Sequence, residues 1–590
     1  MLSYRKLAMR VLGRPLHTGG SDSPRPASQR AAAFVLTAAM LITLAAPAFA
    51  GTWYIENGDI TVKAGETKGT NKVSQGANQE VEDTNTIITN ENKDTASSNT
   101  VTIETNDKND KVEVTLKDVN IDTSSRNNAA VSVTGSGNTT IKLDGDNALK
   151  SDTYRSGIYG SGSLTISGGE NDSLTAQGGS GADGIYGSGS LTISGGTVTA
   201  NGDDGGRGIS SRGGVTISGG STVTANGGNG TISGGDGICS SGGVTISGGS
   251  TVTANGGNGG SIGGGSGIYS NGSVTISGGT VTANGGKGGS GYGGDGIRSL
   301  DHVAISGGTV TANGGNSTNS SGGYGIISLD VAISSGTVTA NGGDSKDGYG
   351  GDGIHSNDVT ISGGTVNAAG GYGGKVGGYG ICSFDRVAIS GGTVEAAGGN
   401  GSTGGGSGIY SSVIDLSGSL ELTAKAGSPT GKALLQNGRE LNLDTIKDKL
   451  GPGAKVTTTD ANGETKQVST PRPVEPEESS SSSDGGSAAP SAPASPLPGL
   501  TVTDKDGQRI SYTSTQSGNT LTVCVGRFTA SFRISLAALR QLRAEGIETI
   551  AFQTILCSTP LSVDELLAMG GEDAEAVLTH RFTDSSLTMG

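Results

Sequence analysis

Residues 208–228 read GISSRGGVTISGGSTVTANGG, and this stretch decides the fold. Isoleucine stands alone at 209, and apolar residues alternate with threonine over 215–217 and 222–225. Alternation with a period of two is typical of strands with one buried face, and glycine and Asn-Gly steps are typical of turns. The stretch therefore predicts three short strands, whose inward residues are Ile209, Val215, Ile217, Val223 and Ala225.

The same three steps recur ten times between residues 157 and 411. The isoleucines of the recurring Gly-Ile step are Ile158, Ile185, Ile209, Ile238, Ile268, Ile297, Ile326, Ile354, Ile381 and Ile409. Their intervals of 24 to 30 residues are typical of stacked-coil architectures. Because each strand is too short to be stable alone, it must pair with its counterpart in the next coil. We therefore predict an all-β fold, a parallel β-helix with three faces and about ten regular coils, right-handed like other parallel crossovers.

Variation in repeat length falls almost entirely in one segment, between Asn-Gly-Gly and the next Gly-Ile step. This segment measures eight residues from Asn201 to Ile209 and thirteen from Asn255 to Ile268. One corner of the solenoid should therefore carry stacked glycine-rich loops. Insertions gathered on one side of a solenoid often mark its binding face.

Residues 1–50 have the features of a secretory signal peptide. A basic start precedes an apolar run over 31–46, and Ala48-Phe49-Ala50 provides a small-x-small cleavage site. The alternative is an uncleaved anchor, for which a run of roughly 16 residues is short of the about 20 needed to span a bilayer. We expect a secreted protein, associated with the cell surface or free, without membrane insertion after cleavage.

The remaining segments differ in composition. Residues 51–150 are strand-rich but irregular and should form longer first coils that cap the solenoid, and 151–427 hold the regular repeats. Residues 428–450, with a short helix over 443–450, should close the other end. Residues 451–500 are rich in proline, serine and glutamate, which is typical of a flexible tether.

Residues 501–590 should form a small α+β domain, to which we assign no function. The run over 521–525 alternates as a strand, and a second strand is expected over 549–554. Ser535 should cap a helix that ends at Gly546, and Ser562 and Glu565 have the spacing of a capping box.

Charge and cysteine content limit the classes of partner. The formal charge of −15 disfavours nucleic acid and anionic membranes and is compatible with cation binding or with solubility alone. Cys239 and Cys382 occupy equivalent positions five coils apart, roughly 24 Å at about 4.8 Å per stacked strand, which is too far for a disulfide. Cys524 and Cys557 could pair.

Aspartate precedes the Gly-Ile step in every second coil, at Asp183, Asp236, Asp295 and Asp352. Skipping a coil doubles the separation of the carboxylates and reduces their repulsion in water from roughly 0.9 to 0.4 kcal/mol. Carboxylates beside the carbonyl groups of glycine-rich loops are a ligand set that Ca²⁺ prefers. The alternative interpretation is structural, because Asp-Gly is a common turn dipeptide.

Asparagine recurs at the end of the third strand in six consecutive coils, at Asn201, Asn226, Asn255, Asn284, Asn313 and Asn341. Stacked amides can hydrogen-bond to each other and to strand ends, so we interpret this ladder as structural. Alanine replaces asparagine at 369 and 397, so the ladder is not obligatory.

Tyrosines recur in the loops and after the Gly-Ile step. Exposed rings on a ridged surface suit stacking against sugars, and the candidates are Tyr269, Tyr292, Tyr324, Tyr349, Tyr372 and Tyr379. The alternative is the ordinary preference of tyrosine for strands.

The sequence shows no catalytic constellation. His17, His302, His355 and His580 are scattered, and no Ser/His/Asp set or zinc spacing is visible. Arg298 near Asp295, and Arg207 in the aspartate position of the third coil, are isolated charges rather than a lyase site.

The chain resembles the parallel β-helix carbohydrate-binding proteins exported by anaerobic Firmicutes. The shared elements are residues 114–121 (VTLKDVNI), the Asp-Gly-Ile-x-Ser steps and the repeated TISGGTVTA, over roughly residues 53–425. The resemblance implies binding of acidic plant polysaccharides such as polygalacturonate, with calcium at Asp183, Asp236, Asp295 and Asp352. Six of the ten coils lack the aspartate, which implies fewer or weaker calcium sites.

We therefore expect a secreted, non-catalytic solenoid that binds acidic plant or cell-surface polysaccharide with the help of Ca²⁺. The rival is a structural or adhesive surface protein in which the solenoid is a stiff spacer. A third alternative is a polysaccharide lyase.

Overall fold

The computed structural model describes residues 50–471 and, with gaps at 505–506, 511, 518, 526–528, 555–557, 570–574 and 581–584, residues 499–589. The predicted signal peptide, except for Ala50, and residues 472–498 of the predicted tether lie outside the described residues. The chain divides into two compact units after Pro476. Within the described residues, no helix is long and apolar enough to cross a bilayer.

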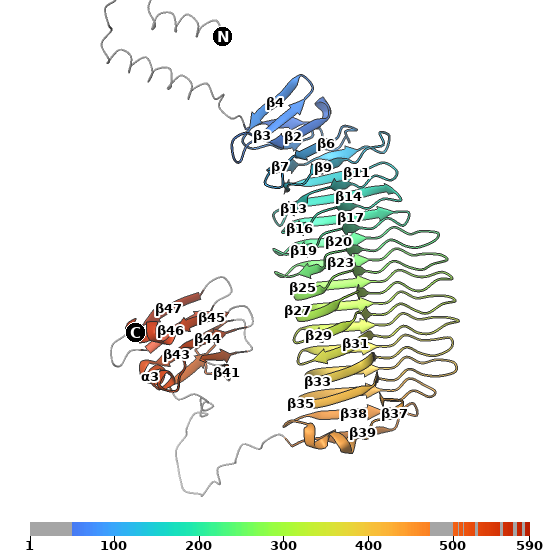
Figure 1. The fold of residues 1–590 in the computed structure, drawn as a ribbon, viewed down its shortest axis with the longest axis vertical. Coiled ribbons are helices and arrows are strands. Elements are labelled where there is room, and N and C mark those ends of the chain that lie inside the picture. Colours follow the sequence, from blue (N-terminus) through green and yellow to red (C-terminus); the bar gives the residue numbers. More distant parts are fainter. Residues whose placement is uncertain are drawn as a thin grey trace, which may run out of the picture. The chain divides into compact units, whose positions relative to one another are not determined.

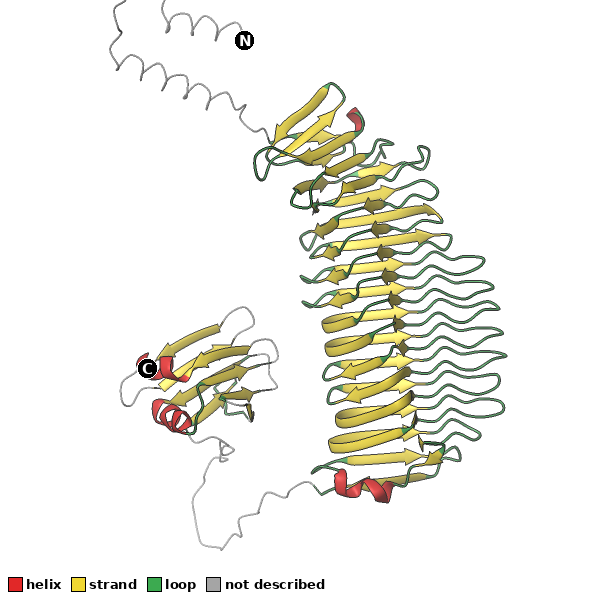
Figure 2. Cartoon of the chain, in the orientation of Figure 1, coloured by secondary structure: helices red, strands yellow, loops and turns green. Residues whose placement is uncertain are grey.

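The first unit is a parallel β-helix of about 15 turns, as predicted (Figures 1 and 2). Its strands form three faces. The first face begins each regular coil with the Gly-Ile isoleucine and contains β2 (Ile60–Ala64), β6 (Val101–Thr105), β9 (Val131–Gly135), β12 (Ile158–Gly160), β15 (Ile185–Gly187), β18 (Ile209–Ser211), β21 (Ile238–Ser240), β24 (Ile268–Ser270), β26 (Ile297–Ser299), β28 (Ile326–Ile327), β34 (Ile409–Ser411) and β36 (Leu434–Gln436).

The second and third faces follow in each coil, and several long strands turn the corners between faces. The second face contains β1 (Thr52–Tyr54), β5 (Ile87–Thr89), β7 (Lys111–Lys117), β10 (Asn138–Asp144), β13 (Ser163–Ser167), β16 (Leu191–Ile193), β19 (Val215–Ile217), β22 (Val244–Ile246) and β29 (Asp330–Ile333). The third face contains β8 (Asn120–Asp122), β11 (Asp146–Lys150), β14 (Ser173–Ser180), β17 (Thr197–Asp203), β20 (Thr222–Asn226), β23 (Thr251–Asn255), β30 (Thr337–Asn341), β32 (Thr365–Ala369) and β38 (Lys455–Thr459). The strands that turn corners are β25 (Val274–Asn284), β27 (His302–Asn313), β31 (Ile354–Ile361), β33 (Ile381–Ala397) and β35 (Val413–Lys425).

Columns of identical or similar apolar side chains fill the interior. The inward residues predicted for residues 208–228 are all buried, each at most 1 % exposed. The register places Ile209 opposite Ile238, and Val223 opposite Val252, in the next coil. Each coil therefore buries its narrow apolar face against its two neighbours, which is how so hydrophilic a sequence can form an ordered core.

The glycine loops connect the third face of one coil to the first face of the next, and their stack protrudes along one side of the solenoid (Figure 1). We use this name for residues 227–237, 256–267, 285–296, 314–325, 342–353, 370–380 and 398–408. The outgoing and returning arms of each loop lie side by side. Gly294 N donates to Gly286 O within one loop, and Gly286 N donates to Gly265 O of the preceding loop, both at 2.8 Å. The same alternation continues from Gly206 to Gly431 as one unbroken chain of backbone hydrogen bonds, which we call the glycine ladder.

Close packing explains why the loop arms are glycine. A Cβ on Gly286 would lie 1.9 Å from Gly257 O, and a Cβ on Gly294 would lie 1.9 Å from Gly265 O. No side chain fits at such a separation, so the composition that looks typical of a flexible segment is required here by neighbouring backbone.

The N-terminal end differs from the expected irregular coils. After η1 (Ile55–Asn57) and β2, the chain forms an antiparallel hairpin from β3 (Asn71–Gln75) and β4 (Asn78–Asp83), with β3 also antiparallel to β2. Asp83 closes this end, since its carboxylate accepts from Gly51 N at 3.0 Å and from Trp53 Nε1 at 2.7 Å. A locally paired hairpin covers the open edge of the first coil, which is a usual means of blocking strand addition.

The predicted boundary between the solenoid and its tether at residue 451 is wrong. After β37 (Arg439–Glu440) and the 3₁₀ helix η2 (Leu443–Lys449), β38 pairs in parallel with β35. An antiparallel partner, β39 (Thr465–Ser469), then covers it. Val456 and Val468 are buried in the main core, so the solenoid extends beyond the Gly-Pro-Gly turn that we interpreted as the start of the tether.

The second unit is a small α+β domain with its own hydrophobic core. One sheet contains β40 (Leu500–Thr503), β43 (Ala530–Ser535), β46 (Glu575–His580) and β47 (Ser585–Met589), and the other contains β41 (Thr513–Ser517), β42 (Thr520–Cys524), β44 (Thr549–Gln553) and β45 (Ser558–Ser562). The helices are α3 (Leu536–Ala544) and α4 (Val563–Met569). The predicted cap of α3 is confirmed, since Ser535 Oγ accepts from Ala538 N.

Candidate functional site

Two columns of residues line the edge where the glycine loops return to the first face. The aspartate column is the position before each Gly-Ile step, namely Ser156, Asp183, Arg207, Asp236, Ser266, Asp295, Tyr324, Asp352, Tyr379 and Ser407. The ring column is the position after each isoleucine, namely Tyr159, Tyr186, Ser210, Cys239, Tyr269, Arg298, Ile327, His355, Cys382 and Tyr410. Strand pairing keeps successive members of the ring column in register.

Each aspartate of the column caps the backbone of the following coil. Oδ1 accepts from the amide at the same position one coil on, at 2.7 Å for Asp183 and Arg207, 2.8 Å for Asp236 and Ser266, 2.8 Å for Asp295 and Tyr324, and 2.7 Å for Asp352 and Tyr379. A hydrogen bond to a charged group contributes about 1.5–3 kcal/mol to stability, so this bond gives each aspartate a structural role.

The second carboxylate oxygen also has a partner in each case. Asp183 bonds to the Ser210 hydroxyl. The Oδ2 atoms of the other three face Arg207 Nε at 3.4 Å from Asp236, Arg298 Nη1 at 3.1 Å from Asp295, and His355 Nδ1 at 2.7 Å from Asp352. Burial raises the pKa of Asp183, Asp236 and Asp295.

This geometry fits Ca²⁺ poorly at three of the four predicted positions. Calcium takes six to eight oxygen ligands, whereas Asp236, Asp295 and Asp352 present an oxygen already paired with a basic nitrogen. Asp183 is different. Among the described residues it has no ion-pair partner of its own, and its further side-chain partner is the Ser210 hydroxyl.

The asparagines predicted to form a ladder lie in register at the ends of the third-face strands. The side-chain amide of each one donates to the Oδ1 atom of the preceding asparagine, at 2.8–2.9 Å, through Asn201, Asn226, Asn255, Asn284, Asn313 and Asn341. The ladder lies where each third-face strand enters its glycine loop, so it fixes the start of the outgoing arm.

The six tyrosines proposed for sugar stacking do not form one surface. Tyr292, Tyr349 and Tyr372 are exposed on the glycine loops. Lys375 Nζ lies over the Tyr349 ring, 5.7 Å from its centre, and the Tyr372 hydroxyl lies 3.1 Å from Ser402 Oγ. Tyr349 and Tyr372 therefore contact other side chains as well as solvent. Tyr292 is the most exposed of the three, at 63 %.

The other three tyrosines belong to the two columns. Tyr324 and Tyr379 occupy the aspartate column, where Tyr324 stacks on His355 at 4.5 Å and Tyr379 stacks on Tyr410 at 5.1 Å between ring centres. Tyr269 lies half-buried in the ring column between Cys239 and Arg298. Tyr324 and Tyr379 lie at the ends of their glycine loops, as predicted, but each ring packs against a residue of the next coil.

An open pocket of about 460 Å³ lies at the first regular coils, and we call it the tyrosine pocket. Its lining residues are Asn128, Ala129, Ser132, Thr134, Tyr154, Arg155, Ser156, Tyr159, Gly181, Ala182, Asp183 and Tyr186. Tyr159 and Tyr186 of the ring column lie in register with each other, and Ser132 of β9 is the register partner of Tyr159 in the preceding coil. The rings of Tyr159 and Tyr186 stack at 5.4 Å with 12° between their planes.

Tyr154 and Arg155, on the short loop before β12, also line this pocket. Tyr154 is 78 % exposed, and its backbone is in the left-handed region at a φ of 60°. Its ring lies beside Gly181, where a Cβ would come within 3.1 Å of the ring. The adjacent Arg155 donates from Nε to Asn127 Oδ1 at 3.2 Å. The pocket thus combines three aromatic rings, a guanidinium and the Asp183 carboxylate.

None of Tyr154, Arg155, Tyr159 and Tyr186 is among the residues predicted from the sequence to bind sugar. The available indication was the adjacency of Tyr154 and Arg155 just before the first Gly-Ile step, opposite a column that begins with two tyrosines.

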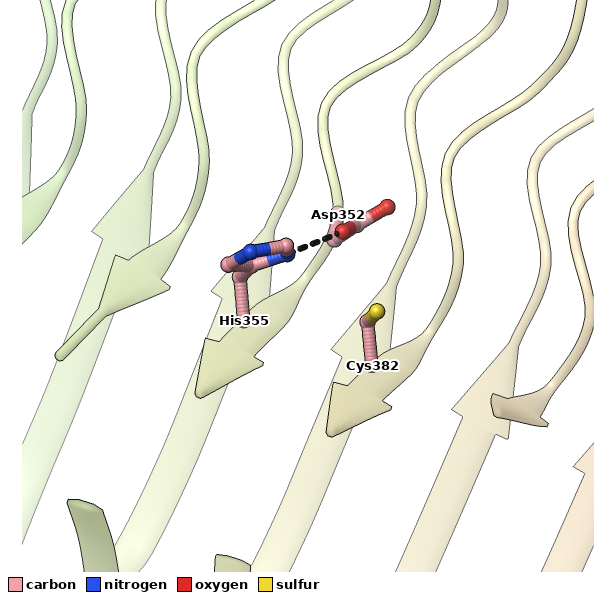
Figure 3. A group of neighbouring side chains, drawn as sticks. All are labelled: Asp352, His355 and Cys382. Atoms are coloured by element: carbon pink, nitrogen blue, oxygen red, sulfur yellow. Dashed lines mark hydrogen bonds and ion pairs between the residues drawn. The ribbon is translucent and has the colours of Figure 1, made fainter. Parts of the chain in front are cut away.

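A second cluster lies farther along the same edge, between neighbouring coils (Figure 3). A carboxylate oxygen of Asp352, a ring nitrogen of His355 and Cys382 Sγ lie within 4.8 Å of one another. His355, the second residue of β31, is in register with Cys382, the second residue of β33. Burial and the nearby Asp352 carboxylate raise the pKa of the Cys382 thiol. Cys239, Cys382 and Cys524 are free thiols, and Cys557 lies outside the described residues.

Comparison with known protein families supports the parallel β-helix fold. The beta helix repeat family matches residues 191–214, 274–297, 303–326, 331–358 and 359–381. The chain is a parallel β-helix protein. No curated protein matches the chain. No solved structure matches it either. The matched repeats lie within the regular coils and include His355 but neither Tyr159 nor Cys382.

Proposed function

We propose that the solenoid binds an acidic polysaccharide at the tyrosine pocket. The observation that carries this proposal is the stacked pair Tyr159 and Tyr186 in the lining of an open pocket that Arg155 also lines. The pocket opens on the side of a long, regular surface, which suits a polymer better than a small molecule that would be enclosed.

The aromatic rings account for the sugar. A pyranose presents a flat C–H face, and rings held by the strand register offer a matching flat surface with little loss of side-chain freedom. Tyr159 is 40 % exposed, and Tyr154, a third tyrosine of the pocket lining, is 78 % exposed. Arg212 lies over the Tyr186 ring, 6.0 Å from its centre, and holds that ring in place.

Arg155 accounts for the acidic character of the ligand. A guanidinium binds carboxylates through two parallel hydrogen bonds, and a uronic acid provides one carboxylate per sugar. The Nε atom is held by Asn127. The side chain therefore has a fixed direction while its terminal nitrogens remain available in the wall of the pocket.

Calcium enters the proposal only at Asp183. This carboxylate lines the same pocket and has no cationic partner within ion-pair distance among the described residues. Ca²⁺ held between Asp183 and a sugar carboxylate would offset the repulsion between the two anions, with sugar hydroxyls completing its oxygen ligands.

Calorimetric titration of the full chain with oligomers of polygalacturonate tests the proposal, with neutral galactan oligomers as the comparison. The double variant Tyr159→Ala with Tyr186→Ala should bind at least about tenfold more weakly, because each ring contributes about 0.5–1.5 kcal/mol beyond its buried area. The matched control is Tyr269→Ala with Tyr292→Ala, which removes two tyrosines outside the pocket and should leave affinity unchanged.

Three outcomes would overturn the proposal. Equal losses in the two double variants would show that the pocket is not the site. Absence of binding to any glycan of a broad array would favour the stiff spacer. Cleavage of polygalacturonate by the full chain would establish a lyase. The calcium component is rejected separately if the affinity for polygalacturonate is the same with added Ca²⁺ and with chelator. It is also rejected if Ca²⁺ raises the affinity of Asp183→Asn as much as it raises that of the unsubstituted chain.

A further inference from the structure

We propose that Asp352, His355 and Cys382 form a binding site for a zinc-class divalent ion. The three donor atoms come from two neighbouring coils and converge at one edge of the solenoid (Figure 3). This site is independent of the tyrosine pocket, whose lining ends at Tyr186.

The donor set selects the metal. One imidazole nitrogen, one thiolate and one carboxylate match the ligands of Zn²⁺, whereas Ca²⁺ and Mg²⁺ take oxygen donors alone. Three protein ligands leave the fourth tetrahedral position for water or another ligand. Bonds of about 2.0–2.3 Å place tetrahedral donors roughly 3.5 Å apart, so a span of 4.8 Å or less needs only small side-chain movements.

Surrounding groups hold two of the three ligands in place. Asp352 Oδ1 is fixed by the Tyr379 amide at 2.7 Å, which leaves Oδ2 directed at His355 Nδ1. The His355 ring is sandwiched by a stack with Tyr324 and an edge contact with Phe384, at 4.5 and 5.2 Å between centres. Such outer contacts are typical of metal ligands, since they fix ring orientation before the ion arrives.

Binding must release protons. The buried Cys382 thiol is protonated in the absence of metal, and the ion replaces that proton with a metal–sulfur bond while the proton leaves to solvent. His355 must present an unprotonated Nδ1, so the proton of the neutral imidazole moves to Nε2, and the hydrogen bond to Asp352 is replaced by one bond from each residue to the metal.

The chain contains a matched arrangement that should not bind. Asp236 and Cys239 repeat the Asp-x-x spacing of Asp352 and His355, with a thiol in place of the imidazole. There Arg207 Nε occupies the carboxylate side at 3.4 Å, and the ring-column neighbours of Cys239 are Ser210 and Tyr269. The arginine places a positive charge at the position that a metal ion would take.

Titration of the reduced full chain with Co²⁺, a spectroscopic substitute for Zn²⁺, tests the proposal. We expect one Co²⁺ per chain with thiolate-to-metal charge-transfer absorption and the visible bands of a tetrahedral ion, both abolished by Zn²⁺. Cys382→Ser should abolish the charge-transfer band, and His355→Gln should weaken binding at least about tenfold. Cys239→Ser should change neither. Far-ultraviolet circular dichroism checks that each variant keeps its sheet content.

The proposal is overturned if folded, reduced protein shows no thiolate band, or if that band survives Cys382→Ser. It is equally overturned if Cys239→Ser abolishes the band, because the thiol would then come from the wrong coil. Binding that persists at full stoichiometry in His355→Gln would indicate an adventitious ion only. None of these readouts depends on polysaccharide, so failure here leaves the proposed function untouched.

Discussion

Each aspartate of the aspartate column makes its own hydrogen bond to the next coil, and Asp183 is an example. Its carboxylate accepts the Arg207 amide of the next coil, so an acidic side chain completes a backbone hydrogen bond where a loop enters a strand. The predictions of a turn residue and of a calcium ligand both omitted this bond, because it joins residues 24 positions apart. The spacing of the repeat determines such a contact only when the pairing of coils is known.

Two substitutions of Asp183 distinguish the contribution of its hydrogen bond to stability from the contribution of its charge. Burial raises the pKa of Asp183 above the ordinary value of 3.8, so the folded state holds this proton more tightly than the unfolded state does. The stability that Asp183 contributes is therefore fully present below about pH 3.8, the ordinary pKa, and is lost as the pH rises through the raised pKa of the folded state. Asp183→Asn should therefore flatten the fall in unfolding free energy from about pH 4 upward, measured by urea denaturation.

Asp183→Ala is the contrasting variant, because alanine cannot accept from Arg207 N. We expect a loss of about 1–3 kcal/mol and faster hydrogen exchange at the Arg207 amide, with little change in exchange for Asp183→Asn. Equal exchange at Arg207 in both variants would show that the capping bond does not stabilise the edge.

At the scale of elements, the glycine loops behave as a sheet-like layer rather than as tethers. Their arms exchange hydrogen bonds within and between coils, and Gly286 takes part in two of those bonds. Chain composition alone assigns these segments to flexible linkers, whereas their packing assigns them to the ordered body of the solenoid.

Gly286→Ala tests this packing. The added methyl would meet Gly257 O at 1.9 Å, so the backbone must move and both hydrogen bonds of Gly286 must weaken. We expect a loss of about 3–5 kcal/mol in unfolding free energy, from about 1 kcal/mol for each of the two bonds and about 1–3 kcal/mol of overpacking. Urea denaturation, with hydrogen exchange at Gly294, measures both effects.

Gly278→Ala is the control in the same coil. A Cβ at Gly278 would have no atom within 4 Å, and we expect a change within about 0.5 kcal/mol. If the two variants lost the same stability, the cost would arise from glycine in general and not from the glycine ladder.

The regular elements could be predicted from the sequence and the ends could not. Alternation at Val215 and Ile217 identifies a strand because every copy repeats it in parallel register. The hairpins of β3 with β4 and of β38 with β39 occur once each, so no repetition distinguishes them from irregular chain. Glycine and proline at 451–453 suggested a tether, although the following strand returns to the core.

The candidate sites were predictable only in part, for a related reason. Columns follow from counting, so the aspartates, the asparagines and the ring column could be placed on one edge. The wall of the tyrosine pocket depends on the left-handed backbone at Tyr154, which no repeat pattern specifies. The Asp352 cluster depends on His355 and Cys382 being register partners, and each was judged separately in the sequence.

At the scale of the whole molecule, the charge of −15 opposes the approach of a polyanion. The Debye length falls from about 30 Å at 0.01 M salt to about 8 Å at 0.15 M, so salt screens this long-range repulsion more than it weakens a close contact with Arg155. We expect the association rate with immobilised polygalacturonate to rise several-fold over that range, measured by surface plasmon resonance.

Arg155→Gln supplies the control for this salt effect. It should lower affinity through faster dissociation while the rise of the association rate with salt persists. An association rate that falls with added salt, as for basic proteins on polyanions, would show that a local positive region dominates the approach and would contradict the account from net charge.

The glycine ladder has a consequence for resistance to proteolysis. Proteases seize their substrates as extended strands and need free amide and carbonyl groups on the segment to be cut. Protruding polar loops are normally the first places to be nicked. Here the loops protrude, yet Gly286 and its counterparts already use their amide and carbonyl groups in hydrogen bonds within their own loop and to a neighbouring loop. A protease could therefore cleave these accessible loops only after their backbone hydrogen bonds had opened, which requires local unfolding of a whole coil.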